Sequence, residues 1–460
     1  MRRGFAGAVA LACLGCATDP RPGPRIAGAT AVALPSNVLG ALVAVRVSGA
    51  DSVGVVFHVR GAAAGADSVA PCVAVAADSA NVPVLGLLPG TAYVLRPLAY
   101  GGGARATGDS VAFTTDTLPG DLPKFAAGGS DPAPGFVVFA SGKYGLAIDN
   151  TGRVVWYHRF PLGVGLDFQA LANGRYVARP APATLSGTGP LVEVDALGDS
   201  TGTLACAGGL PVRFHDALVG PDGSTWIMCD EVRTMDLTPY GGVAAAQVMG
   251  TDIQRIAPDG TVLFRWSPFD HFLITDLDSA ARTGAAVNWT HGNALAFDDD
   301  GNLLVSFRSL SEITKIDVTS GDVLWRLGGL RNQFAFSGPA GAGFAGQHGL
   351  RLDGARGILI LDNVGDPHES RAEHYDIDPV AHTATLTEAY GAVPPVVGMI
   401  GGSVQRLAGG HVLVSYGNGD RVEEYGPDGA LVWELTGDPG YVFRAQRIAS
   451  LYRPGVGTPR

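Results

Sequence analysis

A turn motif that returns along the chain constrains its fold more than any other feature of the sequence. In each copy a strand ends in a tight turn, and glycine stands where the backbone must be left-handed. β-Branched residues and a tryptophan follow. The copies are DNTGRVVW (149–156), APDGTVLFRW (257–266), VTSGDVLW (318–325) and GPDGALVW (426–433). Their recurrence indicates a repeated hairpin and hence a repeat architecture.

A second hairpin lies between successive copies of this turn. It reads FQALANGRYVARP from residue 168, HDALVGPDGSTWIM from 215, HGNALAFDDDGNLLVSF from 291, HGLRLDGARGILILDN from 348 and VQRLAGGHVLVSY from 404. Two hairpins make a four-stranded sheet. Five to six such sheets in succession predict a six-bladed β-propeller over residues 125–455. The segment 441–452 is expected to complete the first blade and close the ring.

Composition agrees with an all-β chain that begins with a smaller domain. The 66 glycines and 30 prolines follow no strict period, and long stretches with a 3.6-residue apolar period are hard to find. Residues 31–116 show short alternating strands that predict a β-sandwich. Within it, LLPGTAYVLRPLAYG resembles the tyrosine corner of fibronectin type III-like domains, which implies that Tyr93 bonds back to the backbone near Leu87.

The N-terminus predicts export. MRRGFAGAVALACLGC has two arginines, an apolar stretch and a cysteine, which indicates a lipoprotein-type signal peptide over residues 1–16. Cys16 is the expected lipidation site, Cys13 is the alternative, and residues 17–30 would form a tether. The protein is therefore expected in the bacterial cell envelope, held to the membrane only by this lipid. The net charge of −11 and the lack of a basic run argue against nucleic acid and anionic membrane surfaces as partners.

Three cysteines follow the leader. In an oxidising compartment a bridge between Cys206 and Cys229 is possible, which would leave Cys72 alone. No CxxC pair occurs after the leader, so no metal site is expected from the cysteines.

Three histidines occupy matching places in the second hairpin. His215, His291 and His348 stand at the head of the expected innermost strand of their blades, 76 and 57 residues apart. In a propeller, equivalent positions on inner strands meet around the central channel. Asp167 and Ser403 hold the corresponding places in other blades. A structural residue repeated in each blade is the alternative interpretation, but the other matching blades lack histidine, and a buried imidazole nitrogen needs a partner.

A second group of polar residues lies one strand further on. Arg308 and Asn363 end equivalent strands, with Asp230 close to that position. Arginine beside histidines suits an oxyanion such as sulfate or phosphate, because its guanidinium offers five fixed donors. Trp289 is expected to line or support the channel mouth, and His271 either to line its entrance or to pack in a loop. The chain contains no GxxxxGK[ST] loop, which argues against a nucleotide-linked donor.

These segments resemble a known family. NWTHGNALAFDDDGNLLVSFRSLSEITKIDVTSGDVLWRLGG (288–329), with GQHGLRL, GILILDN and FRWSPFDHF around it, is similar to the bacterial arylsulfotransferases that use no adenylyl sulfate donor. The resemblance covers roughly residues 125–450 and is most specific between 255 and 365. It implies a six-bladed propeller preceded by a small β-sandwich.

The resemblance also implies roles for individual residues. His348, in GQHGLRL, would be the nucleophile that becomes transiently sulfurylated. His291, Asn293 and Arg308 would bind the sulfuryl group, and His215 would be the remaining active-site histidine. Asn363 is expected in the binding site on position alone.

The expected reaction moves a sulfuryl group from an aryl sulfate donor to a phenolic acceptor by a ping-pong route, without a cofactor or metal. A neutral imidazole nitrogen can displace a phenolate from sulfur, and a second phenol can reverse that step. The alternative function is a non-catalytic, membrane-tethered propeller that serves as a binding or assembly scaffold. Such a scaffold has no need of the histidines and arginine.

Overall fold

The computed structural model describes residues 23–453 apart from 64, 182–188 and 340–341. The predicted signal peptide, with Cys13 and Cys16, and residues 17–22 of the tether lie outside the described residues. Within the described part the secondary structure consists of β-strands and short 3-10 helices, without an α-helix, which confirms the all-β prediction. No helix in these ranges is long and apolar enough to cross a bilayer.

The chain divides into two compact units. Among the described residues, one comprises 23–32, 42–84 and 92–114, and the other comprises 33–41, 85–91 and 115–453. The sequence-based domain limits, 31–116 and 125–455, remain predictions.

The N-terminal strands form two sheets. The first joins β1 (Arg25–Leu34), β2 (Asn37–Ser48) and β5 (Ser79–Val84); the second joins β4 (Ser68–Ala74), β3 (Ser52–Val59), β6 (Ala92–Gly101), β7 (Ala104–Thr107) and β8 (Val111–Thr114). Alternate residues of β2, such as Val43 and Val45, are buried, as expected when one face of a sheet packs on a core. Tyr93 is buried against Phe57, and its fibronectin-like role remains a prediction.

The second unit contains six sheets, which follow one another along the chain. They are β10 (Phe136–Ser141), β11 (Tyr144–Ile148) and β12 (Val154–Arg159); β13 (Phe168–Ala170), β14 (Tyr176–Ala178), β15 (Leu191–Val194) and β16 (Ser200–Leu204); β17 (Val212–Val219), β18 (Thr225–Met235), β19 (Ala246–Ile256) and β20 (Val262–Trp266); β22 (Gly292–Phe297), β23 (Leu303–Phe307), β24 (Glu312–Ile316) and β25 (Val323–Gly328); β27 (His348–Leu352), β28 (Gly357–Asp362), β29 (Arg371–Asp378) and β30 (Thr383–Gly391); and β31 (Ser403–Arg406), β32 (Val412–Ser415), β33 (Val422–Tyr425) and β34 (Leu431–Gly437).

The last strand completes the first of these sheets, as the sequence predicts. β35 (Ala445–Ile448) pairs antiparallel with β10, and Phe136 faces Ile448. Three further strands extend other sheets: β9 (Phe125–Gly129) joins β34, β21 (Ala286–Asn288) joins β19 and β26 (Ala335–Ser337) joins β30. The 3-10 helices are η1 (Ala207–Gly209), η2 (Thr238–Tyr240), η3 (Pro268–Asp270), η4 (Ile274–Asp276), η5 (Ala280–Arg282), η6 (Arg308–Leu310) and η7 (Ala408–Gly410).

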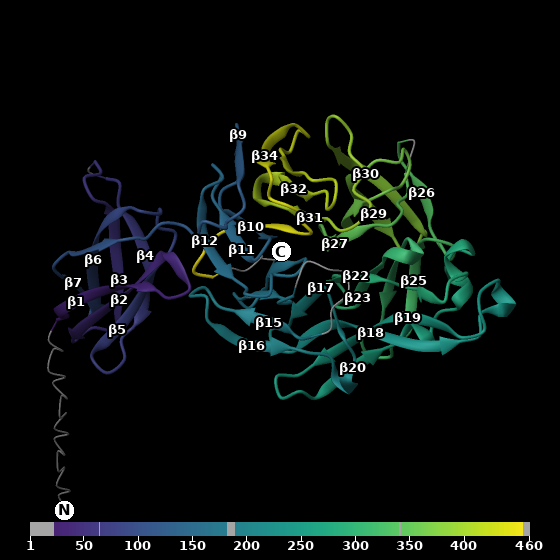
Figure 1. The fold of residues 1–460 in the computed structure, drawn as a ribbon, viewed down its shortest axis with the longest axis horizontal. Helices are drawn as coiled ribbons and strands as arrows, with labels where there is room; N and C mark the ends of the chain where they lie inside the picture. Colours follow the sequence, from purple (N-terminus) through teal and green to yellow (C-terminus); the bar gives the residue numbers. More distant parts are fainter. Residues whose placement is uncertain (1–22, 64, 182–188, 340–341, 454–460) are drawn as a thin grey trace, which may run out of the picture. The chain divides into compact units, whose positions relative to one another are not determined.

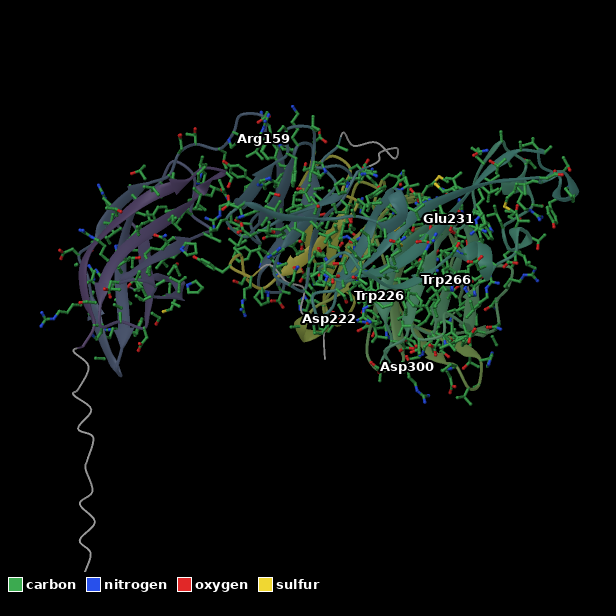
Figure 2. The ribbon with its side chains drawn as sticks, turned by 90° about the horizontal axis from the view of Figure 1, so that it is seen from below. Arg159, Asp222, Trp226, Glu231, Trp266 and Asp300 are labelled. Carbon is green, nitrogen blue, oxygen red and sulfur yellow. A yellow bond between two sulfur atoms is a disulfide. The ribbon has the colours of Figure 1, made fainter. Side chains whose placement is uncertain are left out.

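The sheets succeed one another around a centre in a propeller-like arrangement, with β17, β22, β27 and β31 toward that centre (Figure 1). Asp222, in the turn after β17, and Asp300, in the turn after β22, lie toward one edge in Figure 2, whereas Glu231 on β18 lies toward the opposite edge. The central strands therefore run from one face of the unit to a face lined by hairpin turns.

The repeated turn motif joins the two outer strands of a sheet, as between β11 and β12 or between β19 and β20. Its glycines are left-handed as predicted, with φ of 80° at Gly152, 87° at Gly260, 82° at Gly321 and 79° at Gly429. The tryptophans that follow are buried in the cores between sheets. Three of them donate their indole N–H to a turn of the following sheet: Trp156 to the Ala196 carbonyl at 2.9 Å, Trp266 to Gly321 at 3.1 Å and Trp433 to Asn150 at 2.9 Å. The last of these links the sixth sheet to the first.

Candidate active site

Three histidines converge at the centre of the second unit. His215 lies within β17, His291 directly precedes β22, and His348 begins β27. Their candidate ligand nitrogens all lie within 4.8 Å of one another. The ring centroids of His215 and His291 are 5.1 Å apart, and His348 lies 6.3 Å and 6.4 Å from the other two rings. The repeat-based expectation that they become neighbours is confirmed.

Each of these strands leaves its regular register at the histidine. The β17–β18 ladder shifts between Val212 and Ala217, the β22–β23 ladder between Gly292 and Ala294, and the β27–β28 ladder between His348 and Arg351. Such bulges re-aim side chains at functional sites.

Glycine follows two of the histidines because neighbouring atoms leave no room for a side chain. Gly349 has a φ of 66°, and a Cβ there would stand 2.8 Å from the Cα of Ser403. A Cβ on Gly292 would stand 2.7 Å from the methyl group of Thr251. The HG pairs of the sequence are therefore a packing requirement.

The hydrogen bonds of Asn363 fix the tautomer of His348. Its Nδ2 donates to the carbonyls of Gly398 at 2.5 Å and Gly401 at 2.9 Å, so Oδ1 must face the imidazole. That oxygen lies 2.8 Å from His348 Nδ1 and accepts its proton. The lone pair of His348 is consequently on Nε2, the nitrogen on the other side of the ring.

His348 is held in its neutral form. It is 2% exposed, and this burial lowers the pKa of His348 to about 3; Asn363 opposes the shift and the charge of Arg308 adds to it. Around neutral pH the ring therefore carries one proton on Nδ1 and an unprotonated Nε2. The backbone N–H of Gly401 donates to Nε2 at 3.3 Å.

The two other imidazoles are also neutral. Burial lowers the pKa of His215 well below its ordinary value, and the neighbouring His291 adds to the effect. Its Nδ1 has no hydrogen-bond partner among the described residues. Burial likewise lowers the pKa of His291, with Arg213 as the next cause. Asn288 Nδ2 lies 2.6 Å from His291 Nδ1, and with the amide as donor the proton of His291 sits on Nε2.

Two guanidinium groups make the surroundings positive. Arg308 Nη2 donates to the Met399 carbonyl at 2.8 Å, while its Nε has no partner in the described part of the chain. Arg213 is buried and lies 2.8 Å from Asp230. The three histidines could hold a metal ion by geometry. Charges that oppose protonation of the imidazoles oppose a cation as well, so the site favours an anion.

The remaining predicted residues surround this cluster in different ways. Asn293 is buried and donates Nδ2 to the Gln347 carbonyl at 2.7 Å, next to His348. Trp289 is 1% exposed and packs against Phe269, so it supports the site and does not line an open mouth. His271 is exposed and stacks on Trp266, in contact with none of the three histidines as far as the structure is described. It therefore packs in a loop.

Two positions expected to match the histidines do not join them. Asp167 binds Arg444, whose Nε lies 3.0 Å from both carboxylate oxygens, and Ser403 Oγ donates to the Ala445 carbonyl. Asp230 is the partner of Arg213 and lies beside neither Arg308 nor Asn363 in any described contact.

Other residues of the site were missed by the sequence reasoning. Phe443 contacts the rings of both His215 and His348 at centroid distances of 5.4 Å and 6.1 Å, and Arg213 stands two residues before His215. The signal for Phe443 was its place close to the start of β35, the innermost strand of its sheet, because the histidines lie near the starts of the innermost strands of other sheets. The alternation in VRFHDAL would have placed Arg213 on the same side as His215.

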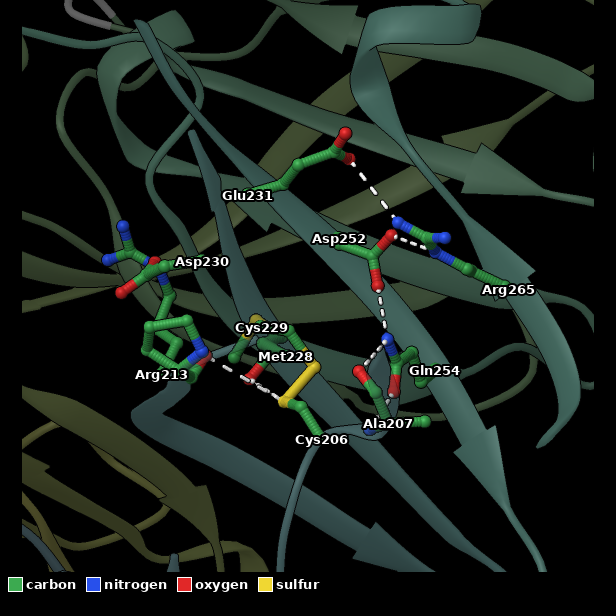
Figure 3. The surroundings of a disulfide bond; sticks show 11 residues. Cys206, Ala207, Arg213, Met228, Cys229, Asp230, Glu231, Asp252, Gln254 and Arg265 are labelled. Atoms are coloured by element: carbon green, nitrogen blue, oxygen red, sulfur yellow. Dashed lines mark hydrogen bonds and ion pairs between the residues drawn. A yellow bond between two sulfur atoms is a disulfide. The ribbon is translucent and has the colours of Figure 1, made fainter. Parts of the chain in front are cut away.

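A disulfide lies behind the site (Figure 3). Cys206 and Cys229 are bonded, which confirms the bridge considered from the sequence, and Cys72 is free and exposed. The bond ties the segment before β17 to β18, and the next residue, Asp230, holds Arg213. The cross-link thereby anchors the strand pair that presents His215.

Comparison with known proteins gives one family match. Residues 211–438 match the family model described as Arylsulfotransferase (ASST). No curated protein sequence matches the chain. Solved structures with a similar fold include a protein of unknown function from Bacteroides caccae (13% identity, TM-score 0.44, 68% of this chain and 98% of that one) and a catalytically inactive virginiamycin B lyase from Staphylococcus aureus (9%, 0.38, 68% and 100%). A streptogramin B lyase is also similar (11%, 0.40, 70% and 85%). Through residues 211–438, which carry all three clustered histidines, the chain belongs to the arylsulfotransferase family.

Proposed function

We propose that this protein transfers a sulfuryl group from an aryl sulfate to a phenolic acceptor through a covalent sulfohistidine on His348. The family match supports arylsulfotransferase chemistry in general. The observation that carries the specific mechanism is the tautomer of His348. Asn363 holds the proton on Nδ1, so Nε2 is unprotonated and can attack sulfur once it gives up the weak hydrogen bond that it accepts from the Gly401 N–H at 3.3 Å.

In the first half-reaction, Nε2 of His348 forms a bond to sulfur while the bond from sulfur to the aryl oxygen breaks. The phenolate leaves with that electron pair, and the histidine becomes an N-sulfo imidazolium whose proton stays on Nδ1, hydrogen-bonded to Asn363 Oδ1. Arg308 Nε, His291 Nε2–H and the second N–H of Asn293 are the donors proposed for the sulfuryl oxygens. Charge on those oxygens is spread as in phosphoryl transfer, so positioned donors supply most of the catalysis.

His215 carries the proton between the two half-reactions. Burial keeps it neutral in the empty site, but a bound sulfate ester brings a negative charge that favours uptake of a proton from solvent, which is released again when the product leaves. It passes this proton to the departing phenolate. In the second half-reaction it takes the proton of the acceptor phenol, whose oxygen attacks sulfur as the bond to His348 breaks. The donor becomes a phenol, the acceptor becomes an aryl sulfate, and the enzyme returns unchanged.

The architecture proposed for this activity is a closed six-bladed propeller that follows a fibronectin type III-like sandwich. The pairing of β35 with β10 and the Trp433 link between sixth and first sheets support closure. We further propose that the chain is exported and lipid-anchored at Cys16, as its leader predicts, with the cell envelope as its location.

The test is a transfer assay with a chromogenic aryl sulfate and a second phenol. Wild type should release phenol and sulfate the acceptor, and His348→Ala should do neither. His58→Ala is the matched control because His58 lies in β3 of the other unit. With donor alone, intact-mass measurement should find one added SO₃ group on the peptide that contains His348. If no sulfuryl transfer occurs with any of several phenols, the non-catalytic scaffold becomes the favoured function. If the added SO₃ group is found on another peptide, the nucleophile is not His348.

A further inference from the structure

A cavity lies further along the same central strands, beyond the histidines. It has a volume of about 490 Å³, within the range of roughly 300–1000 Å³ typical of small-molecule sites. Its walls are mainly apolar and include Leu218, Leu295, Phe297, Leu352 and Val404. In β17, β22 and β27 these residues follow the histidines along the strand. The cavity therefore lies toward the face that holds the hairpin turns (Figure 2).

A layer of charged residues separates the cavity from the histidines. This charge layer consists of Asp167, Asp216, Arg351 and Arg444. Arg444 Nε lies 3.0 Å from both oxygens of Asp167, and Arg351 Nη1 lies 3.0 Å from Asp216. Asp216 directly follows His215, and Arg351 lies three residues after His348 on β27.

Asp216 accepts hydrogen bonds from three donors, and only one of them belongs to Arg351. Its Oδ1 accepts from Gln169 Nε2 at 2.9 Å, and its Oδ2 accepts from the backbone N–H of Leu295 at 3.0 Å as well as from Arg351. Arg444 Nη2 approaches it at 3.7 Å. Both carboxylate oxygens are thus occupied.

Arg351 consequently presents part of its guanidinium to the cavity. Both of its hydrogen bonds, to Asp216 and to the Leu350 carbonyl, use Nη1. Its Nε and Nη2 have no protein partner within the described ranges. Its side chain is 26% exposed although the central strands surround it, and it lines the cavity. Two adjacent free donors on a guanidinium match the two oxygens of a carboxylate.

We propose that this cavity binds a small amphiphilic carboxylate, such as a medium-chain fatty acid, with its head group on Arg351 and its chain against the leucine-rich walls. Apolar walls without a charge would take a neutral molecule equally well, and an open guanidinium without apolar walls would take inorganic anions. The combination selects an amphiphile. This inference does not depend on the proposed sulfuryl transfer.

The test is calorimetric titration of the full chain with decanoate below its micelle concentration, with decanol as the uncharged comparison. Decanoate should bind wild type at least tenfold more tightly than decanol, and Arg351→Met should remove that preference. Leu352→Trp fills the cavity without touching the charge layer, and should weaken decanoate at least tenfold even if Arg351→Met fails to fold. Leu431→Trp is the matched control because Leu431 is a half-exposed leucine in β34 outside the cavity.

A further arm separates this cavity from the histidine cluster. His348→Ala should leave decanoate affinity unchanged, and an aryl sulfate should not compete with decanoate. Competition, or loss of binding in His348→Ala, would move the ligand to the histidines and overturn the proposal. Absence of decanoate binding to wild type, or equal affinity in Leu352→Trp, would also overturn it.

Discussion

Replacing Asn363 with aspartate tests whether burial and a neutral hydrogen-bond partner keep His348 unprotonated. The substitution retains an oxygen acceptor 2.8 Å from Nδ1 but makes it negative and removes the two N–H groups that bind Gly398 and Gly401. A negative charge at that distance favours the imidazolium. In wild type the pKa of His348 is lowered to about 3 by burial, so the nucleophile stays unprotonated throughout the mildly acidic range.

The expected size of the effect follows from this contact. An opposite charge within about 4–6 Å changes a pKa by roughly 1–3, so Asn363→Asp should bring the pKa of His348 to about 4–6. Asn363→Ala is the matched variant without a charge. It loses the hydrogen bond to the imidazolium, which is worth about 1.5–3 kcal/mol once that charge is complete, so roughly 10- to 150-fold is the upper limit for the slowing of the first half-reaction. The pH at which Asn363→Ala loses activity on the acid side should not rise.

The assay is the single-turnover release of phenol from an aryl sulfate, in which a loss of rate toward low pH reports on protonation of His348 and a loss toward high pH on the proton of His215. Rates are compared between about pH 4 and pH 8. Asn363→Asp should lose half its rate on the acid side of this range, whereas wild type and Asn363→Ala should be flat there. A wild-type rate that halves near about pH 6.5, the ordinary histidine pKa, would refute the reasoning. Identical profiles for the aspartate and alanine variants would show that residue 363 does not act on Nδ1.

Three further outcomes are expected. Arg308→Lys keeps the charge but loses the planar fork, and should lower kcat/KM for an aryl sulfate by about 100-fold in steady-state assays; an unchanged value would exclude Arg308 from donor binding. Gly349→Ala, which puts a Cβ 2.8 Å from Ser403 with φ at 66°, should cost about 1–3 kcal/mol in thermal unfolding. Gly354→Ala, with φ at 80° and open space around it, should cost less. Burial raises the pKa of Glu373 from 4.5 to about 8, so folding retains a proton that the unfolded chain releases, and this group's contribution to stability falls as pH rises across that window. Glu373→Gln should reduce this fall in the free energy of unfolding, measured by urea titration at a series of pH values. An unchanged pH dependence would mean that Glu373 ionises normally.

The repeat made much of this architecture predictable. Turn glycines and tryptophans at fixed offsets report the backbone conformation and the packing of each copy, so the succession of sheets and the left-handed glycines follow from the sequence. The meeting of His215, His291 and His348 follows as well, because equivalent positions in a repeat are equivalent in space. The Cys206–Cys229 bond could be considered from the cysteine count but not decided, since pairing depends on the distance between the two residues in the fold.

Equivalence of position did not predict equivalence of role. Asn363 and Arg308 end matching strands, but the arginine is long enough to reach the Met399 carbonyl and keep a free donor. The short amide of Asn363 is fully used by His348 and two nearby backbone carbonyls. Asn363, which the sequence placed in the binding site, is therefore positioned to support His348. Asp167 occupies a position that matches the histidines but does not join them, because it binds Arg444. Arg444 comes from the far end of the chain, and no local sequence pattern links the two residues.

The way this site lowers the pKa of its nucleophile fits the reaction proposed for it. A histidine can be activated by a carboxylate, which makes it more basic, or by burial beside a neutral amide, which keeps it unprotonated but less basic. In a loose transition state the bond to the nucleophile is only slightly formed, so lower basicity costs little in the first half-reaction. It helps the second, in which the same imidazole must depart from sulfur. An amide at Asn363 in place of a carboxylate therefore suits a histidine that must both accept the sulfuryl group and release it.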